Sequence, residues 1–213
     1  MSESREPWRD DPRAARVAGR LRRVVLDLAE ERPIAEIGVA EISRLAGISR
    51  STFYKHAASP ARLLKSVLTE ELLHIANTVQ TRLRSGEGDL RALTRDGLGA
   101  VLDHVRAHEQ IYRLALSETG SPELHRLLAD HFRQSVLLVF QLSHLQAPPL
   151  PRTSPEPDDT WELFAAFVGG AYAEVITVWL REPTPRTPES VIDILLAALP
   201  AWMLHPRPSP AVR

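Results

Sequence analysis

The segment 39–56 constrains the fold most, because it encodes two short helices joined by a tight turn. Apolar residues at three- and four-residue spacing fill the first two helical turns. Gly47 follows, and glycine is the residue best suited to the left-handed conformation that often ends a helix. Ser49 is then a good N-cap for a second helix over 50–56, in which Phe53 points inward. The segment therefore predicts a helix-turn-helix, a recurring supersecondary unit.

The rest of the sequence is patterned for helices, and no alternating strand pattern appears. A first amphipathic helix runs from Arg16 until Pro33 ends it, and Ser59–Pro60 starts a long helix that continues to about Leu83. Further helices are expected over 89–106, 108–118, 122–145, 159–181 and 188–204. The proline-rich stretch 148–159 predicts an exposed loop. The expected fold class is all-α.

Composition narrows the classes of protein that this chain can belong to. It has no cysteine, which excludes disulfides and thiolate metal sites and is typical of a reducing compartment. The first thirty residues are rich in arginine and lack an apolar stretch, so they do not look like a secretion signal. The segment 161–180 is apolar enough to raise the question of a membrane span, but Glu162 and Glu174 would each be costly in hydrocarbon. We expect a cytoplasmic protein without a membrane partner.

The second helix of the segment 39–56 gathers hydrogen-bond donors. They are Arg50, Ser51, Thr52, Tyr54, Lys55 and His56. Such groups suit phosphates and base edges, and a helix that enters the major groove of DNA needs them on its first turns. A plain helical hairpin shares the periodicity but does not predict this polar face. The net charge of −1 gives no such indication, since nucleic-acid-binding domains are often strongly basic.

The same segment resembles the DNA-binding signature of the TetR family of regulators, which runs approximately Ile-Ala-x-x-Ala-Gly-Val-Ser-x-x-Thr-Leu-Tyr-x-His-Phe. The residues at corresponding positions are Ile42, Ala46, Gly47, Ile48, Ser49, Thr52, Phe53, Tyr54 and His56. The resemblance covers about residues 16–72 and continues in an all-helical C-terminal part that matches in character rather than in motif. It implies that Arg50, Ser51 and Lys55 face bases and that Phe53 anchors the helix in the core. The residues that it implies as phosphate contacts are Thr52, Tyr54 and His56.

Three positions depart from the family pattern. Gly38 stands where a helix-capping threonine is usual, Ala57 replaces an aromatic residue, and Pro60 replaces a phosphate-binding lysine. Compensation is available from Arg62 or Lys65 on the next helix, or from arginines of the first helix and the arm before it. A solvated helix face explains those arginines about as well.

The last two helices carry more apolar residues than one buried face needs, which predicts a dimer surface. The interface residues that we expect are Phe164, Val168, Tyr172, Ile176, Trp179, Leu195 and Leu199. The resemblance implies the same surface, because these helices commonly form a four-helix dimer interface in the family. An ordinary core within one chain is the alternative reading of the pattern.

The helices between residues 89 and 145 are the expected place of an effector pocket, since bundles place cavities between helices. The candidate lining residues are His104, His108, Tyr112 and Phe132. His104 and His108 are four residues apart, a spacing that can bind metal, but no acidic ligand stands with them in a recognised motif. We therefore expect neither a metal nor a cofactor.

Together these features predict an all-α chain with an N-terminal three-helix helix-turn-helix domain, joined by a long helix to a helical ligand-binding and dimerisation domain. The expected parts are a flexible arm (1–15), the DNA-binding domain (16–58), the effector-binding and dimerisation domain (59–204) and a disordered tail (205–213). The function indicated is a homodimeric repressor that binds a palindromic operator and is released by a small-molecule effector.

Three other functions compete with a repressor. An activator or an effector-independent regulator would have the same sequence features, and a protein-interaction module without DNA binding is a remote alternative. An enzyme is disfavoured because the sequence lacks a glycine-rich phosphate loop, a G-x-S-x-G elbow and an H-E-x-x-H motif.

Overall fold

The structure is a computed structural model that describes residues 12–116, 122–143, 157–184 and 186–204. Every regular element within these ranges is a helix, so the all-α prediction is confirmed. The described residues fall into two compact units, one up to Thr69 and one from Glu70 onward. The boundary lies inside a single long helix, α4 (Pro60–Ser85), which supplies residues to both units.

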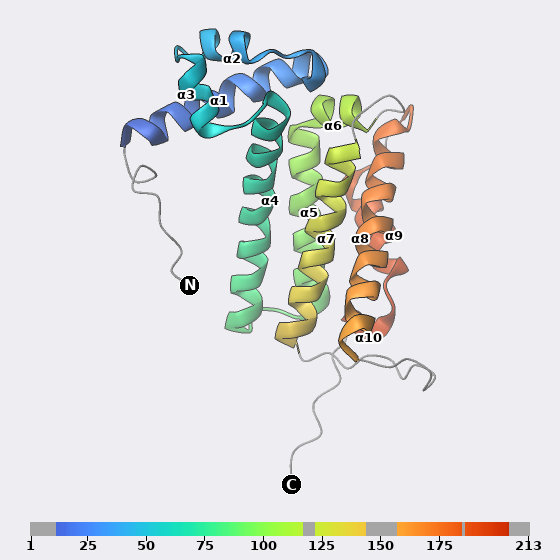
Figure 1. Ribbon diagram of the computed structural model, residues 1–213. Coiled ribbons are helices and arrows are strands. Elements are labelled where there is room, and N and C mark those ends of the chain that lie inside the picture. The colour runs from blue at the N-terminus through green and yellow to red at the C-terminus, as the bar shows by residue number, and fades with distance from the viewer. Residues whose placement is uncertain (1–11, 117–121, 144–156, 185, 205–213) are drawn as a thin grey trace. The chain divides into compact units, whose positions relative to one another are not determined.

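The first unit contains α1 (Pro12–Glu31), the short 3₁₀ turn η1 (Ile34–Glu36), α2 (Val39–Leu45), α3 (Arg50–His56) and the start of α4 (Figure 1). Its core residues come from every helix, because each one has a single apolar stripe to bury. The side chains that are fully buried here are Leu21, Val25, Ile42, Phe53 and Leu68. Burial of this set fixes α2 and α3 against α1 and the first turns of α4.

The first helix begins earlier than the sequence pattern indicated. It starts at Pro12 rather than Arg16, so residues 12–15 belong to the helix and not to the predicted arm. Proline is tolerated in the first turn of a helix, where its missing N–H would have no partner, and the guanidinium of Arg16 donates back to the Pro12 carbonyl over 3.2 Å. Residues 1–11 of the expected arm and the expected tail 205–213 lie outside the described residues.

The turn between α2 and α3 has the geometry that its sequence predicts. Gly47 adopts a φ of 62°, in the left-handed region that favours glycine. The backbone N–H of Ile48 donates to the carbonyl of Ser43 over 2.9 Å, which closes the end of α2. Gly38 occupies the N-cap of α2 and offers no side-chain hydrogen bond, as its departure from the family pattern implied.

The second unit is a bundle built on α5 (Leu90–Ala107), α7 (Pro122–Ser143), α8 (Pro157–Arg181) and α9 (Pro188–Ala198), which run alongside one another (Figure 1). Short helices α6 (Glu109–Ala115) and α10 (Ala201–Leu204) complete the unit. The helix predicted over 188–204 is split into α9 and α10, because Pro200 lacks the N–H that a continuing helix needs. Conversely, α8 extends into the predicted loop 148–159, whose remaining residues 148–156 lie outside the described ranges.

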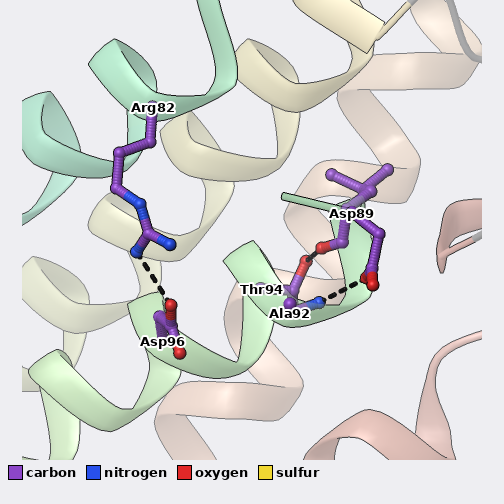
Figure 2. Close-up of polar contacts among 6 residues, drawn as sticks. Arg82, Asp89, Ala92, Thr94 and Asp96 are labelled. Carbon is purple, nitrogen blue, oxygen red and sulfur yellow. Dashed lines mark hydrogen bonds and ion pairs between the residues drawn. The ribbon is translucent and has the colours of Figure 1, made fainter. Parts of the chain in front are cut away.

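The junction between α4 and α5 is fixed by local polar contacts (Figure 2). The Asp89 carboxylate caps α5 by accepting from the backbone N–H of Ala92 over 2.7 Å. Across the turn, Arg82 of α4 forms an ion pair with Asp96 of α5 at 2.8 Å. Gly97 lets the two helices approach closely, since a Cβ there would lie 3.2 Å from a methyl group of Val79. The end of α4 is thereby held in the second unit.

Helix α8 is the most apolar element. Its segment Trp161–Arg181 is long and apolar enough to cross a membrane by length and composition alone, and half of that segment is buried inside the fold. The core helix of a soluble bundle meets the same criteria. Its burial against α7 accounts for the apolar sequence without a bilayer.

Candidate DNA-binding surface and ligand cavity

Helix α3 presents the polar face that the sequence predicts. Arg50, Ser51 and Lys55 are exposed, and the Tyr54 side chain is 59% exposed. Two further candidate residues, Thr52 and His56, are half-buried. These six residues lie on one short helix, where a groove-reading element would need them.

Phe53 and Ser49 hold α3 in place. The Phe53 side chain is fully buried in the core of the unit, and the exposed ring of Tyr54 meets it edge-on at a centroid distance of 5.7 Å. The Ser49 hydroxyl accepts from the backbone N–H of Thr52 over 3.1 Å and so caps the helix. The same hydroxyl lies 2.8 Å from the Ser51 hydroxyl and 2.9 Å from that of Thr52. The first turn of α3 is therefore ordered before any ligand arrives.

Other helices of the first unit also carry exposed basic side chains. Arg16, Arg20 and Arg23 are exposed on α1, and Arg62 is exposed in the first turn of α4. Lys65 is half-buried. Exposed guanidinium groups are the side chains best suited to bidentate contacts with phosphate. The unit thus has cations available in place of the lysine that Pro60 replaces.

The second unit contains an apolar cavity of about 100 Å³, which is room for several water molecules or a small ligand. Residues of α4, α5, α7, α8 and α10 line it. Most of the lining is aliphatic, with a few polar groups at the wall: Gln80, Thr94, His131, Ser135 and Tyr172. An apolar chamber with a few polar groups is the usual form of a small-molecule site.

Two polar residues of the wall are held neutral. Burial, and then the charge of nearby His104, lowers the pKa of His131 to about 4, so its imidazole is uncharged near neutral pH. Burial raises the pKa of Tyr172 above its usual value, and its hydroxyl donates to the Leu195 carbonyl over 3.0 Å. The cavity therefore offers hydrogen bonds but no full charge from these two groups.

Only one of the four predicted pocket residues lines this cavity. Phe132 does, whereas His104, His108 and Tyr112 form a separate polar cluster with Glu71. Helical spacing shows that residues share a face but not which neighbour that face meets, so it could not place these three relative to the cavity. Their contact with an effector stays a prediction. His131 was missed as a lining residue, although it directly precedes Phe132 in the sequence.

The predicted dimer residues also need correction. Val168, Tyr172, Ile176, Trp179 and Leu195 are at most 5% exposed, so they belong to the core of the single chain. Phe164 and Leu199 are half-buried in an aromatic cluster with Phe140 and Trp202. The apolar side chains of α8 and α9 that are exposed instead are Leu163, Phe167, Val178 and Ile194. Burial of this set within one chain supports the alternative interpretation, an intrachain core, and the dimer interface stays a prediction.

The comparisons with known proteins decide the family. A model of the C-terminal region of TetR-type transcriptional regulators matches residues 94–200, about half of the chain. The chain belongs to the TetR family of transcriptional regulators. No curated protein matches the chain.

Solved structures of other regulators share this fold. A TetR regulator from Streptococcus agalactiae is 17% identical, with a TM-score of 0.59 over 90% of this chain and 98% of that one. The fatty acid degradation regulator FadR from Bacillus halodurans is 14% identical, with a TM-score of 0.59 over 85% and 99%. RolR in complex with resorcinol is 17% identical, with a TM-score of 0.55 over 92% and 97%. At such identities the likeness establishes the fold.

TetR membership confirms three of the sequence predictions. The resemblance found in the segment 42–56 is correct, the fold is an N-terminal helix-turn-helix followed by a helical C-terminal domain, and the protein is a transcription regulator rather than an enzyme. A DNA-binding regulator with a ligand-binding C-terminal domain is the function that the family supports.

Proposed function

We propose that this TetR regulator is a cytoplasmic, homodimeric repressor that reads a palindromic operator with α3 and leaves it when a small effector fills the C-terminal cavity. The observation that carries the proposal is the polar face of α3, exposed on a helix that is capped by Ser49 and anchored by fully buried Phe53. The Tyr54 ring is 59% exposed, so its hydroxyl is free to reach a phosphate.

Each polar residue of α3 has a role in this proposal. Arg50 opens the helix and reads guanine through a bidentate contact in the major groove, and Ser51 and Lys55 face neighbouring bases. Thr52, Tyr54 and His56 hold phosphates and set the register of the helix in the groove. Arg62 and the exposed arginines of α1 add phosphate contacts, which makes binding strongly dependent on salt.

A dimer follows from the small size of the reading element, because one helix-turn-helix makes too few contacts for specific binding at physiological salt. We place the interface on the exposed apolar stripe of α8, formed by Leu163, Phe167 and Val178, together with Ile194 of α9. The residues of α8 in this stripe recur on one helix face by their spacing. Exposed Glu174 lies on the same face and would sit near the partner or at the rim.

The effector that the cavity supports is small and mainly apolar, since its wall is aliphatic with neutral hydrogen-bonding groups at His131 and Tyr172. FadR, a fatty acid degradation regulator, and RolR, which was solved in complex with resorcinol, are structural neighbours that fit such chemistry. An effector releases the operator only through a higher affinity for the DNA-free state. Fatty acids and simple phenols, added to the preformed DNA complex, are the first ligands to assay for release.

The deciding experiment is fluorescence-anisotropy binding to the DNA that flanks the coding region, at two salt concentrations and with competitor DNA. We expect Arg50→Ala to lose about 1–3 kcal/mol of specific binding and to relax base preference at one position. Because Lys55 faces a base in this proposal, Lys55→Ala should also relax base preference; a reduced salt dependence with unchanged preference would place its ammonium on a phosphate instead. Tyr54→Ala should weaken binding to all sequences.

Arg91→Ala is the matched control for that experiment. Arg91 is exposed on α5 in the second unit, so the substitution removes the same charge from outside the helix-turn-helix. It should leave operator affinity within about twofold of the unmodified protein, in line with the small effect of most surface substitutions. If all five proteins bind every DNA equally weakly, and selection from random sequences also yields no site, the interaction-module alternative replaces the repressor.

Phe167→Glu tests the dimer. Phe167 is 71% exposed in the single chain, so the folded protomer should tolerate a carboxylate there, whereas two such charges facing each other would disfavour association. Sedimentation equilibrium should shift from dimer to monomer. Leu73→Glu is the control, because Leu73 is 55% exposed on α4, outside the stripe. A Phe167→Glu protein that remains dimeric would place the interface elsewhere.

A further inference from the structure

The side chains of Glu71, His104 and His108 form a polar cluster outside the apolar cavity. One carboxylate oxygen of Glu71 lies 2.9 Å from Nδ1 of His104 and 2.7 Å from Nε2 of His108. The three ligand atoms all lie within 4.8 Å of one another. The His104 and His108 rings meet edge-on at 5.1 Å between centroids. Two imidazoles and one carboxylate thus converge on a single point in the second unit.

The local sequence explains why these groups converge. His104 lies in the last turn of α5 and His108 is its C-cap, so the two are one helical turn apart on the same face. Glu71 comes from α4, which packs beside α5. The ion pair between Arg82 and Asp96 joins these two helices. Glu71 and His104 lie within helices, and His108 is the single residue that joins α5 to α6, so the site is held by the packed helices and not by a long loop.

The chemistry of the donors selects a class of metal. Two neutral imidazole nitrogens and a carboxylate form the ligand set of catalytic zinc sites and related divalent transition-metal centres, whereas magnesium and calcium prefer oxygen alone. Ligand atoms around tetrahedral zinc stand about 3.4 Å apart when each is about 2.0–2.1 Å from the ion. A shift of about 1 Å in the ring positions brings the three atoms to that spacing. The ion then replaces the two protons that lie between the Glu71 carboxylate and the imidazole nitrogens.

Tyr112 supplies an outer partner of the kind that metal-ligating histidines have. Its hydroxyl lies 2.9 Å from Nε2 of His104, and its ring is fully buried. When Nδ1 of His104 binds an ion, the proton on Nε2 is donated to this hydroxyl, which fixes the tautomer and the ring orientation. The two ring nitrogens of His104 thus have separate and compatible roles.

Burial of the cluster favours the binding of a cation. The side chains of His104, His108 and Glu71 are only 5%, 12% and 23% exposed. A carboxylate in such surroundings is stabilised by a positive charge beside it.

We propose that Glu71, His104 and His108 bind one divalent transition-metal ion, with zinc as the best fit, and that Tyr112 positions His104. Three protein ligands leave a fourth position for water or an anionic or carbonyl group of a ligand. This site is separate from the apolar cavity, because none of its three ligands lines that cavity. It is independent of whether the regulator represses or activates.

The test is metal binding by the full chain after treatment with a chelator. Zinc is titrated by calorimetry and in competition with a chromogenic chelator, and cobalt(II) is titrated by its visible absorption, which reports coordination by the protein. We expect one ion per chain and a raised thermal midpoint in its presence. Glu71→Gln and His104→Ala should each weaken zinc binding by at least about 100-fold, and Tyr112→Phe, which removes only the hydroxyl, by about 10- to 100-fold.

His74→Ala is the matched control, since His74 is an exposed histidine on the same helix as Glu71. It should bind zinc as the unmodified chain does. The proposal is overturned if the unmodified chain takes up no zinc, or if Glu71→Gln, which keeps the size and shape of the side chain, binds it equally well. DNA is absent from this assay, so operator binding in the same preparations separates a failure of the metal site from a failure of the proposed regulator.

Discussion

Replacing Phe53 by alanine should lower the free energy of unfolding of the first unit by about 3–5 kcal/mol, the usual range for removing a buried phenylalanine. Phe53 is fully buried, and it is the one buried aromatic side chain among residues 12–69. Hydrogen exchange of the amides in α1, α2 and α3 measures the effect directly, because it reports on this unit apart from the bundle.

Tyr54→Ala is the comparison for Phe53→Ala. Tyr54 follows it in the chain but is 59% exposed, so its loss should leave hydrogen exchange nearly unchanged while weakening DNA binding. The pair separates two roles on adjacent residues, one in holding α3 and the other in contacting DNA. Equal protection in Phe53→Ala and the unmodified protein would show that α3 is not anchored by this ring.

The helix-turn-helix was predictable because its determinants are local. Gly47 ends α2 with a positive φ, Ser49 caps α3, and Phe53 is the one apolar residue in the middle of a polar helix. Each of these acts within a few residues of its own position, so the pattern of residue types carries the information. The start of α1 at Pro12 was missed because the apolar stripe that marked the helix begins only after its first turn.

The packing of the bundle was less predictable, because the residues that contact one another in it are distant in sequence. The apolar spacing of α8 correctly showed an amphipathic helix, but it could not show whether Val168 and Ile176 face a neighbour in the same chain or a second chain. The structure assigns them to the core. For the same reason the acidic ligand of the histidine pair was invisible, since Glu71 is 37 residues before His108 and belongs to no sequence motif.

Gly169→Ala should destabilise the bundle by about 1–3 kcal/mol, the usual cost of overpacking. Helices α7 and α8 pack closely at this residue, and a Cβ on Gly169 would lie 2.5 Å from the carbonyl oxygen of Ala129 and 3.0 Å from the backbone nitrogen of Arg133. Both are backbone atoms, so they cannot rotate away and the helices must separate. Urea denaturation, monitored by circular dichroism, measures the change in the free energy of unfolding.

Gly170→Ala is the control for Gly169→Ala, because a Cβ at Gly170 meets nothing within 4 Å. Alanine favours helix over glycine by up to about 1 kcal/mol, so this variant should be as stable as the unmodified protein or more stable. The two substitutions add the same methyl group to adjacent positions of one helix, and helix propensity would predict a gain from both. A loss of stability from Gly169→Ala and a gain from Gly170→Ala would therefore isolate the α7–α8 contact. A gain in stability from Gly169→Ala would mean that the helices do not approach as closely as described. Helix α7 also supplies His131 and Phe132 to the cavity wall. The same separation of helices should therefore alter effector binding more than operator binding.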